Sequence, residues 1–376
     1  MYKINFQKPI HIHFIGIGGI SMSGLAEILL EEGFTVSGSD AKESPLTKKL
    51  ESEGAVIHYG QCAENITDDI NCVVYTAAIN KSNPELMEAV GKKIPMLTRA
   101  ELLGQLMKNY DTPIAVSGTH GKTTTTSMIS EVLLAADMDP TISVGGILKT
   151  IGGNIRVGKS GNFITEACEY TNSFLHFYPK ISVILNIEED HLDFFKDLED
   201  IRHSFHQFSA LLPSDGTLII NGDIKDYQEI YEGLDCNVIT YGSSAEFDYS
   251  ATEIQYDEKG FVSFELLKHN TSCGRVQLSV TGDHNVSNAL AAIATAELLG
   301  IPMDTIRKGL LSFSGTDRRF EYKGTFNGVT VVDDYAHHPT EIAATLKAAQ
   351  HYPHNEIWCV FQPHTYTRTK AFFHEF

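Results

Sequence analysis

The sequence has little positive charge, no closely spaced cysteine pairs and no long apolar run. Its 29 lysines and arginines are outnumbered by 48 aspartates and glutamates, which leaves a formal net charge of −19. This excess of acidic groups argues against nucleic acid or an anionic membrane as the main partner, because both repel a negatively charged surface. A small anionic ligand is still compatible with it, since a single loop can bind a phosphate locally.

The six cysteines are scattered along the chain, and no C-x-x-C pair occurs. Neither a zinc site nor a disulfide framework is therefore indicated, and we expect reduced thiols in a cytoplasmic protein. No apolar run approaches about 18 residues, the length that a membrane-spanning helix needs. The N-terminus lacks the apolar core and the small-residue cleavage site of a signal peptide.

A chain of 376 residues predicts two or three domains. Residues 1–110 alternate strand and helix, which is typical of a parallel sheet with helical crossovers and places the domain in the α/β class. The expected strands lie at 10–16, 34–40 and 71–79, and a helix is expected at 21–33.

A probable linker at Asp111 and Pro113 opens a second α/β unit, residues 111–314. Its expected elements are strands 113–117, 162–166 and 181–187, helices 123–136 and 284–300, and an antiparallel patch made by 248–256, 261–267 and 275–280.

A third unit, residues 315–376, begins with a hairpin whose turn is Asn327-Gly328. A helix at 339–350, a strand at 356–362 and a helix that starts near Arg368 should follow.

The stretch "GTHGKTTTT" at 118–126 joins an expected strand to an expected helix. Backbone N–H groups of such a turn point at one spot and suit a phosphate. Lys122 would reach the β- and γ-phosphates, and the Thr123 hydroxyl would bind Mg²⁺. Val116 stands where the strict pattern has its first glycine, and a glycine-rich turn without a ligand is the alternative. The residues assigned to the nucleotide are Gly118, Thr119, His120, Gly121, Lys122, Thr123 and Thr124.

A second glycine-rich turn, "HFIGIGGISMSG", also follows a strand and precedes a helix. Gly16, Gly18 and Gly19 with Asp40, 22 residues after Gly18, resemble a dinucleotide fingerprint, although Ser21 occupies the place of its third glycine. The pattern predicts a pyrophosphate at a helix N-terminus and does not specify nicotinamide. Glycines that only shape a tight turn are the alternative.

Polar residues follow two strands of the second unit. Glu166 ends one of them, and His191 comes shortly after the other, behind Asn186. The carboxyl ends of parallel strands form the crevice where ligands bind in open sheets, and phosphoryl transfer needs metal ions there. By itself His191 is more typical of a surface histidine than of a ligand. We expect Glu169 and Asp190 to be solvated or to contact the ligand side chains from behind.

The third unit adds an arginine pair that includes Arg319, which could clamp a phosphoryl group or lie free on the surface. Asp334 is a candidate acceptor for a ribose hydroxyl, and His337 could face a substrate. Asn285 and Asn288 open a predicted helix, where capping is their ordinary role.

Taken together, these motifs resemble the Mur ligases of peptidoglycan synthesis. The resemblance runs from about residue 10 to residue 369, through the segments "HFIGIGGISMSGLAE", "GTHGKTTTT", "EACEYTNSFL", "NIEEDHLD", "GDHNVSNALAA", "SGTDRRFE" and "DDYAHHPTE". It implies three domains: a Rossmann-like UDP-sugar domain, a P-loop-type central ATPase domain with a mostly parallel sheet, and a Rossmann-like C-terminal domain. Family members continue beyond this point, so we expect that last domain to be incomplete here.

The resemblance also implies an activity. ATP would phosphorylate the carboxylate of UDP-N-acetylmuramate, and the amine of L-alanine would attack the acyl phosphate. Lys122, Glu166, His191, Arg319 and His337 would be catalytic. The metal ligands would be Thr123, Glu166 and His191; Asn285, Asn288 and Asp334 would hold the adenosine part of ATP; Gly16, Gly18, Gly19, Asp40, His337 and Arg368 would bind the substrates.

Three other functions compete with this interpretation. A ligase that joins a recycled peptide to the same UDP-sugar would share every motif except the amino-acid pocket. A dehydrogenase would explain the first glycine turn but would leave Lys122, Glu166 and His191 without a role. A nucleotide-binding regulator would not need two nucleotide loops in separate domains.

Overall fold

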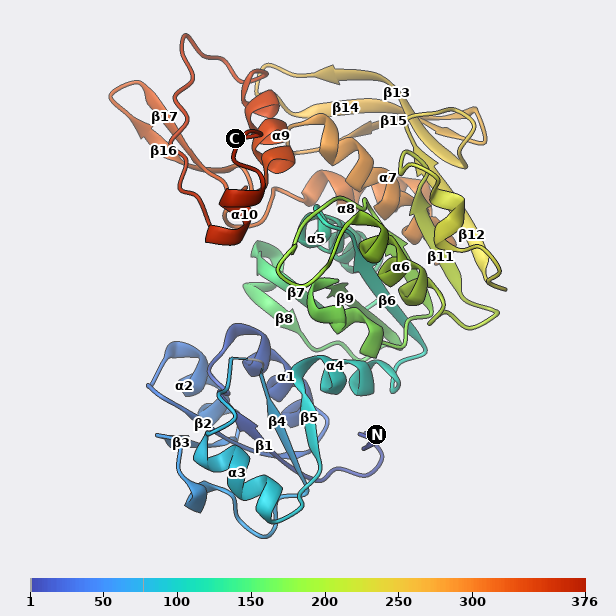
Figure 1. Ribbon diagram of the computed structural model, residues 1–376. Helices are drawn as coiled ribbons and strands as arrows, with labels where there is room; N and C mark the ends of the chain where they lie inside the picture. The colour runs from blue at the N-terminus through green and yellow to red at the C-terminus, as the bar shows by residue number, and fades with distance from the viewer. Residues whose placement is uncertain (1, 77) are drawn as a thin grey trace.

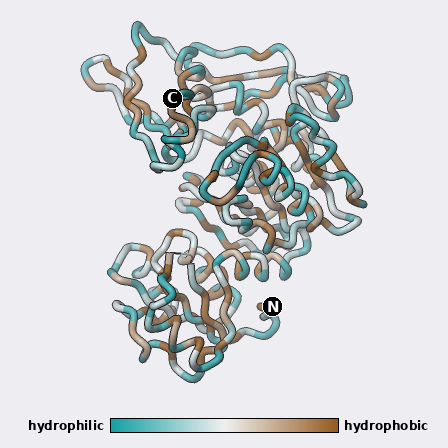
Figure 2. Tube along the Cα trace, in the orientation of Figure 1, coloured by the Kyte–Doolittle hydropathy of each residue, from teal (hydrophilic) through white to brown (hydrophobic). Residues whose placement is uncertain are grey.

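The computed structural model describes residues 2–76 and 78–376. In Figure 1 the first hundred residues form a separate lower body, and the rest of the chain forms a larger upper body. Among the described residues, no helix combines the length and the apolar character needed to cross a bilayer. Figure 2 shows hydrophobic residues in the interior of both bodies and hydrophilic residues along much of their outer loops, as expected for sheets covered by helices.

The lower body contains a five-stranded sheet in the order β3-β2-β1-β4-β5, with every neighbouring pair parallel. The expected parallel sheet is therefore confirmed. The expectation for 71–79 extends over Ala77, which lies outside the described residues. The strands are β1 (His11–Ile15), β2 (Thr35–Asp40), β3 (Val56–Tyr59), β4 (Cys72–Tyr75) and β5 (Met96–Thr98).

The helices of this body begin with recognisable start signals. Thr98 caps α4 in a reciprocal capping box with Glu101, and Pro45 and Pro84 open two other helices at positions that need no backbone N–H. The helices are α1 (Ile20–Glu31), α2 (Pro45–Ser52), α3 (Pro84–Gly91) and α4 (Arg99–Met107), with a short 3₁₀ turn η1 (Ala63–Asn65).

The upper body contains a ten-stranded sheet in the order β15-β14-β13-β12-β11-β10-β6-β9-β7-β8. Its centre, from β13 to β7, is parallel, whereas β13–β14, β14–β15 and β7–β8 are antiparallel. The expected antiparallel patch is thus confirmed as one end of this sheet. The strands are β6 (Thr112–Ser117), β7 (Thr141–Leu148), β8 (Gly153–Arg156), β9 (Asn162–Ala167), β10 (Ile181–Ile184), β11 (Thr217–Asn221), β12 (Asn237–Gly242), β13 (Tyr249–Tyr256), β14 (Val262–Lys268) and β15 (Thr271–Gln277).

Helices α5 and α7 pack against each other and are buried along most of their length. The small alanine side chains of α7 allow this close approach, because they keep neighbouring backbones near one another. These elements form one hydrophobic core with the sheet strands. The helices are α5 (Lys122–Ala135), α6 (Leu198–Ser209), α7 (Asp283–Leu298) and α8 (Met303–Ser312), with 3₁₀ segments η2 (Lys149–Ile151), η3 (Tyr170–His176) and η4 (Tyr227–Ile230).

The last part of the chain forms the hairpin β16 (Glu321–Phe326) and β17 (Val329–Asp333), then α9 (Pro339–Ala349) and α10 (Tyr366–Ala371). The strand predicted at 356–362 is wrong, since this segment has no regular structure. Trp358 and Val360 are 84% and 97% exposed, and among the described residues no strand pairs with the segment. The strand expected at 181–187 ends at Ile184, and the next residues form a loop.

The two bodies are joined by close helix contacts. A Cβ at Gly104 of α4 would lie 1.9 Å from the carbonyl oxygen of His176, and one at Gly24 of α1 would lie 2.1 Å from Ile155. Both positions therefore need glycine for the bodies to approach. One hydrophobic cluster contains residues of both.

Candidate active site

The loop between β6 and α5 has the shape expected of a phosphate loop. Gly118 and Gly121 have φ values of 145° and 83°, in the region that favours glycine, and Gly121 caps α5. Asn186, just after β10, holds the loop from the side. Its Oδ1 accepts the His120 N–H at 2.7 Å, and its Nδ2 donates to the His120 carbonyl at 3.0 Å. The backbone at His120 is thus held on both sides by the Asn186 side chain.

Lys122 folds back over this loop. Its Nζ donates to the carbonyl oxygens of Gly118 and Thr119 at 2.5 and 3.1 Å and to Oε2 of Glu169 at 2.9 Å. Burial disfavours the ammonium, but the Glu169 carboxylate outweighs burial and raises the pKa of Lys122. Glu169 is 2% exposed and pairs directly with the loop lysine, so the solvated alternative for this residue is wrong, and a position behind the ligands stays the prediction. Parallel strand ends bring the two residues together, and their spacing in the sequence does not indicate the contact.

Glu166 ends β9, the strand beside β6, where it is paired in register with Val116. One carboxylate oxygen accepts the Gly145 N–H at 2.5 Å, and the carboxylate also interacts with the Thr123 side chain. Burial raises the pKa of Glu166. A buried carboxylate next to a hydroxyl at the start of a helix offers the oxygen donors that Mg²⁺ prefers.

His191 lies beside the same strand ends, and its backbone has a φ of 52°. Its Nε2 is 3.7 Å from a Glu169 oxygen, and its ring stacks on Tyr170 with centroids 4.4 Å apart. Burial lowers the pKa of His191, which leaves the imidazole neutral and able to bind a metal ion. The structure places Thr123, Glu166 and His191 around Lys122 and Glu169.

A cavity of about 640 Å³ opens beside the loop. Asn288 lies close to the loop, since its Oδ1 would be 2.8 Å from a Cβ placed at Gly121. Asn285 donates to the Thr281 carbonyl at 2.7 Å and accepts from Asn288 at 3.0 Å, so it organises α7 and does not cap it. The predicted site residues that line this cavity are His120, Gly121, Thr124, Asn285, Asn288, Arg319 and Asp334.

A second cavity of about 270 Å³ is lined by His191, His337 and Arg368, among others. Arg368 forms a two-point ion pair with Asp190, with Nε to Oδ1 at 3.0 Å and Nη2 to Oδ2 at 3.2 Å. Both partners are largely buried, so the solvated alternative for Asp190 is wrong, and a position behind the ligands stays the prediction. This pair joins α10 to the loop that carries His191.

The glycine turn of the lower body is shaped for a ligand that approaches its backbone. Asp40 accepts the Gly18 N–H at 2.8 Å, Gly16 has a φ of 84°, and Gly19 caps α1. A side chain at Gly18 would meet Asp40 at 2.8 Å. None of Gly16, Gly18, Gly19 and Asp40 lines either cavity above, so the described geometry does not bring this turn to the phosphate loop.

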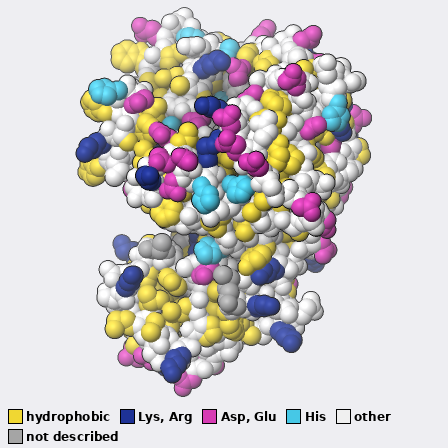
Figure 3. Space-filling view, turned by 45° about the vertical axis from the view of Figure 1, so that its right-hand side comes forward, with side chains coloured by type: hydrophobic (Ala, Val, Ile, Leu, Met, Phe, Trp, Pro, Cys, Tyr) yellow, Lys and Arg dark blue, Asp and Glu magenta, His cyan; other side chains and the backbone are white. Residues whose placement is uncertain are grey.

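The upper body carries most of these groups. Figure 3 shows acidic, basic and histidine side chains gathered together on one face of it, above the narrowing between the two bodies. Three residues with central contacts were not predicted: Glu169, Asn186 as a loop clamp, and Glu341. A signal for Glu341 exists in the sequence, because it stands at the third position of the helix that begins at Pro339, where a capping glutamate is typical.

Three family models match the chain in succession. They are described as "Mur ligase family, catalytic domain" for residues 11–111, "Mur ligase middle domain" for 116–296 and "Mur ligase, glutamate ligase domain" for 318–376. The chain belongs to the Mur ligase family. The expected α/β fold class with three family domains is confirmed by these matches.

Relatives of this Mur ligase extend the comparison. UDP-N-acetylmuramate–L-alanine ligase of Agathobacter rectalis is 63% identical over 376 residues, which are 100% of this chain and 82% of the relative. The crystal structure of UDP-N-acetylmuramate-alanine ligase from Thermotoga maritima is 30% identical with a TM-score of 0.77, and the match covers 91% of this chain and 78% of that one. The structure of UDP-N-acetylmuramate:L-alanyl-gamma-D-glutamyl-meso-diaminopimelate ligase from Neisseria meningitides is 31% identical with a TM-score of 0.74, and the match covers 83% and 100%.

Proposed function

We propose that this protein is an ATP-dependent carboxylate–amine ligase that joins L-alanine to the carboxylate of UDP-N-acetylmuramate, with release of ADP and phosphate. The reaction would serve peptidoglycan synthesis in the cytoplasm. The identity of 63% to an L-alanine ligase supports this substrate pair. The observation that carries the chemistry is the meeting of Lys122, Glu166 and His191 at one edge of the central sheet, beside a cavity of about 640 Å³.

The three domains would divide the work. We assign residues 1–110 to the UDP-sugar, 111–314 to ATP and 315–376 to the amino acid. Gly16, Gly18 and Gly19 would present backbone N–H groups to the pyrophosphate, and Asp40 orders that turn through Gly18. The residues assigned to the adenosine part of ATP are Asn285, Asn288 and Asp334.

Mg²⁺ fits the donors at the edge of the sheet. Thr123 and Glu166 supply oxygen, one Glu166 oxygen is already oriented by Gly145, and His191 offers a neutral nitrogen. When bound there, Mg²⁺ would neutralise charge on the phosphates of ATP.

The reaction follows from the weakness of a carboxylate as an acyl donor. Transfer of the γ-phosphoryl group from ATP to the muramate carboxylate makes an acyl phosphate, whose leaving group is phosphate. The amine of L-alanine attacks the acyl carbon, and the tetrahedral intermediate collapses to the amide. Lys122 and Arg319 would stabilise the transferring charge, while His337 and Arg368 would orient the amino acid.

The rival ligase for a recycled peptide differs only in its amine substrate. The identity of 63% to an L-alanine ligase favours L-alanine as the amine, and the cavity lined by His337 and Arg368 is where we place it. Phosphate release measured with ATP, UDP-N-acetylmuramate and either L-alanine or the tripeptide L-alanyl-γ-D-glutamyl-diaminopimelate tests the choice. Turnover with the tripeptide alone would overturn the proposal. A dehydrogenase or a regulator would give no release with either amine.

A further inference from the structure

A single carboxylate, Glu341, connects several residues of the site. Its Oε1 lies 3.2 Å from Nδ1 of His120 on the phosphate loop and 3.7 Å from Nη1 of Arg319. Its Oε2 accepts the backbone N–H groups of His337 and His338 at 3.1 and 3.4 Å. One side chain of α9 thus contacts the loop that would bind phosphate, the arginine assigned to the γ-phosphate and the histidine assigned to the amino acid.

His120 is placed to receive this contact. Asn186 holds the His120 backbone through both its N–H and its carbonyl, so the imidazole is not needed to shape the loop. The ring lies between two carboxylates, with Nε2 3.5 Å from Glu188 and Nδ1 facing Glu341, and it packs on the ring of His338 at 4.7 Å. The side chains of His120 and Glu341 are 13% and 12% exposed.

The contact is an ion pair at neutral pH. Burial opposes a charge on His120, but Glu188 and Glu341 outweigh burial and raise its pKa to about 9. Burial also opposes the carboxylate of Glu341, yet His120 and Arg319 hold the pKa of Glu341 well below its usual range. Weak screening at such low exposure makes the pair stronger than a surface pair.

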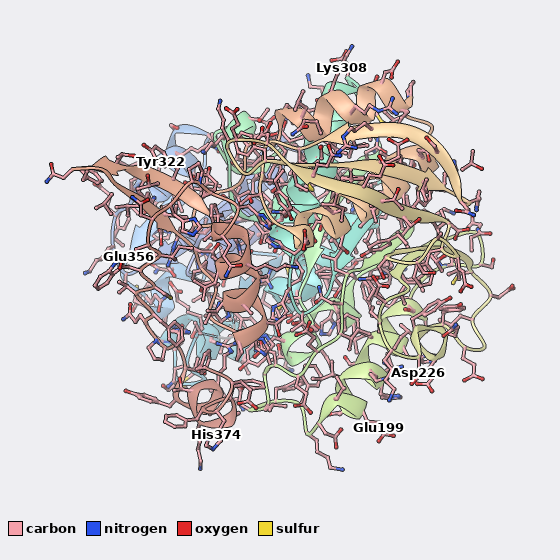
Figure 4. The ribbon with its side chains drawn as sticks, turned by 90° about the horizontal axis from the view of Figure 1, so that it is seen from above. Glu199, Asp226, Lys308, Tyr322, Glu356 and His374 are labelled. Atoms are coloured by element: carbon pink, nitrogen blue, oxygen red, sulfur yellow. The ribbon has the colours of Figure 1, made fainter. Side chains whose placement is uncertain are left out.

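We infer that His120 and Glu341 are positioning residues: their ion pair holds α9 against the phosphate loop and so places Arg319 and His337 for the reaction. The inference deepens the proposed function and rests on it for the roles of Arg319 and His337. In Figure 4, α9 lies between the central sheet and the outer rim marked by Tyr322 and Glu356, where it can link the two. Without the pair, α9 keeps fewer contacts to the phosphate loop. When Glu341 itself is replaced, Arg319 also loses the carboxylate that orients it.

The test compares two single variants, Glu341→Gln and His120→Gln, with the double variant. Glutamine keeps the size of Glu341 and can still accept the N–H groups of the capping box, but it carries no charge. Glu101→Gln is the matched control, because Glu101 occupies the same capping-box position in α4 and accepts the Thr98 N–H at 2.7 Å. It therefore reports the loss of a capping charge alone.

We expect kcat to fall by about ten- to a hundredfold in each single variant, since misplacement of reacting groups by about 1 Å has that effect. The double variant should resemble the single ones, because both changes remove the same link. The control should keep its kcat. Additive losses in the double variant, or an equal loss in Glu101→Gln, would overturn the inference.

The pH dependence of kcat distinguishes a positioning role from a merely structural one, which would leave that dependence unchanged. Because the pKa of His120 is raised, the stabilisation that the pair contributes is fully present below about 6.5, the ordinary pKa of histidine. It is lost as pH rises through about 9. Glu188, Glu341 and His338 face His120 directly. Arg319 lies next to Glu341. In Glu341→Gln the pair is absent at every pH, so the fall of kcat that its loss causes at alkaline pH should be absent as well.

Hydrogen exchange separates this inference from the proposed function. Amides of α9 should exchange faster in His120→Gln than in the unchanged protein, although the substitution lies in another domain and leaves every residue of α9 and of its cap in place. No ligation by the unchanged protein, with this effect on exchange present, would refute the proposed function and leave the pair standing. Normal ligation with unchanged exchange and unchanged kcat in His120→Gln would refute the inference.

Discussion

Nζ of Lys122 lies 2.9 Å from Oε2 of Glu169, and the two side chains are only 16% and 3% exposed. The lysine that would bind the phosphates of ATP is therefore already oriented and charged before any nucleotide arrives. Breaking a buried pair by removing one partner leaves an uncompensated charge, which costs about 3–5 kcal/mol. Stability and catalysis are thus coupled at this residue.

We predict that Lys122→Met abolishes ADP formation and also lowers the free energy of unfolding by about 3 kcal/mol, because Glu169 is left buried and unpaired. The double variant Lys122→Met/Glu169→Gln should recover most of the stability and none of the activity. ADP release and urea unfolding measure the two effects. Near-normal turnover in Lys122→Met would refute the assignment of the phosphate loop.

We predict that Glu166→Gln weakens the use of Mg²⁺ more than the docking of ATP. The amide keeps the shape of the side chain and can accept the Gly145 N–H, but it lacks the charge that a hard cation prefers. The Mg²⁺ concentration at half-maximal activity should rise by about tenfold or more. Glu131→Gln is a suitable control, because Glu131 is buried in α5 and bonded to Thr150. An unchanged metal dependence would make Glu166 structural.

We predict that the first domain binds UDP-N-acetylmuramate and not NAD. At 100 times its dissociation constant, the UDP-sugar should stabilise the protein by about 2.7 kcal/mol in thermal unfolding, and NAD should have no effect. Gly18→Ala should abolish this stabilisation, because the new Cβ would lie only 2.8 Å from Oδ2 of Asp40 and would push that side chain away. Gly91→Ala, which meets open space, should keep it. Stabilisation by NAD alone would support a dehydrogenase instead.

We predict that Arg368→Lys raises KM for L-alanine by about tenfold or more and leaves KM for ATP within about twofold. Lysine keeps the charge but cannot repeat the two-point contact with Asp190, and one charged hydrogen bond is worth about 1.5–3 kcal/mol. Initial rates at varied L-alanine measure this. The control is Arg307→Lys, at an arginine of α8 that lines neither cavity. An equal rise of both KM values would place Arg368 outside the amino-acid pocket.

The sequence by itself determined the features that are local. Strand, glycine turn and helix follow one another within about twenty residues at Gly18 and again at Gly121, and the alternation of such units leaves a parallel sheet as the compact solution. Residue types at strand ends also predicted that Glu166 and His191 belong to one edge, because the carboxyl ends of parallel strands meet there.

Only the tertiary structure decided which distant side chains pair. Glu169 with Lys122, Arg368 with Asp190 and Glu341 with His120 each join segments that are separate in the sequence. The sequence left open whether Glu169 and Asp190 are solvated or lie behind the ligands. The apolar segment 356–362 has the local pattern of a strand but does not form one, since a strand forms only where a partner strand lies beside it. Local patterns set the conformation of short segments, whereas burial and ion pairing depend on neighbours that the fold supplies.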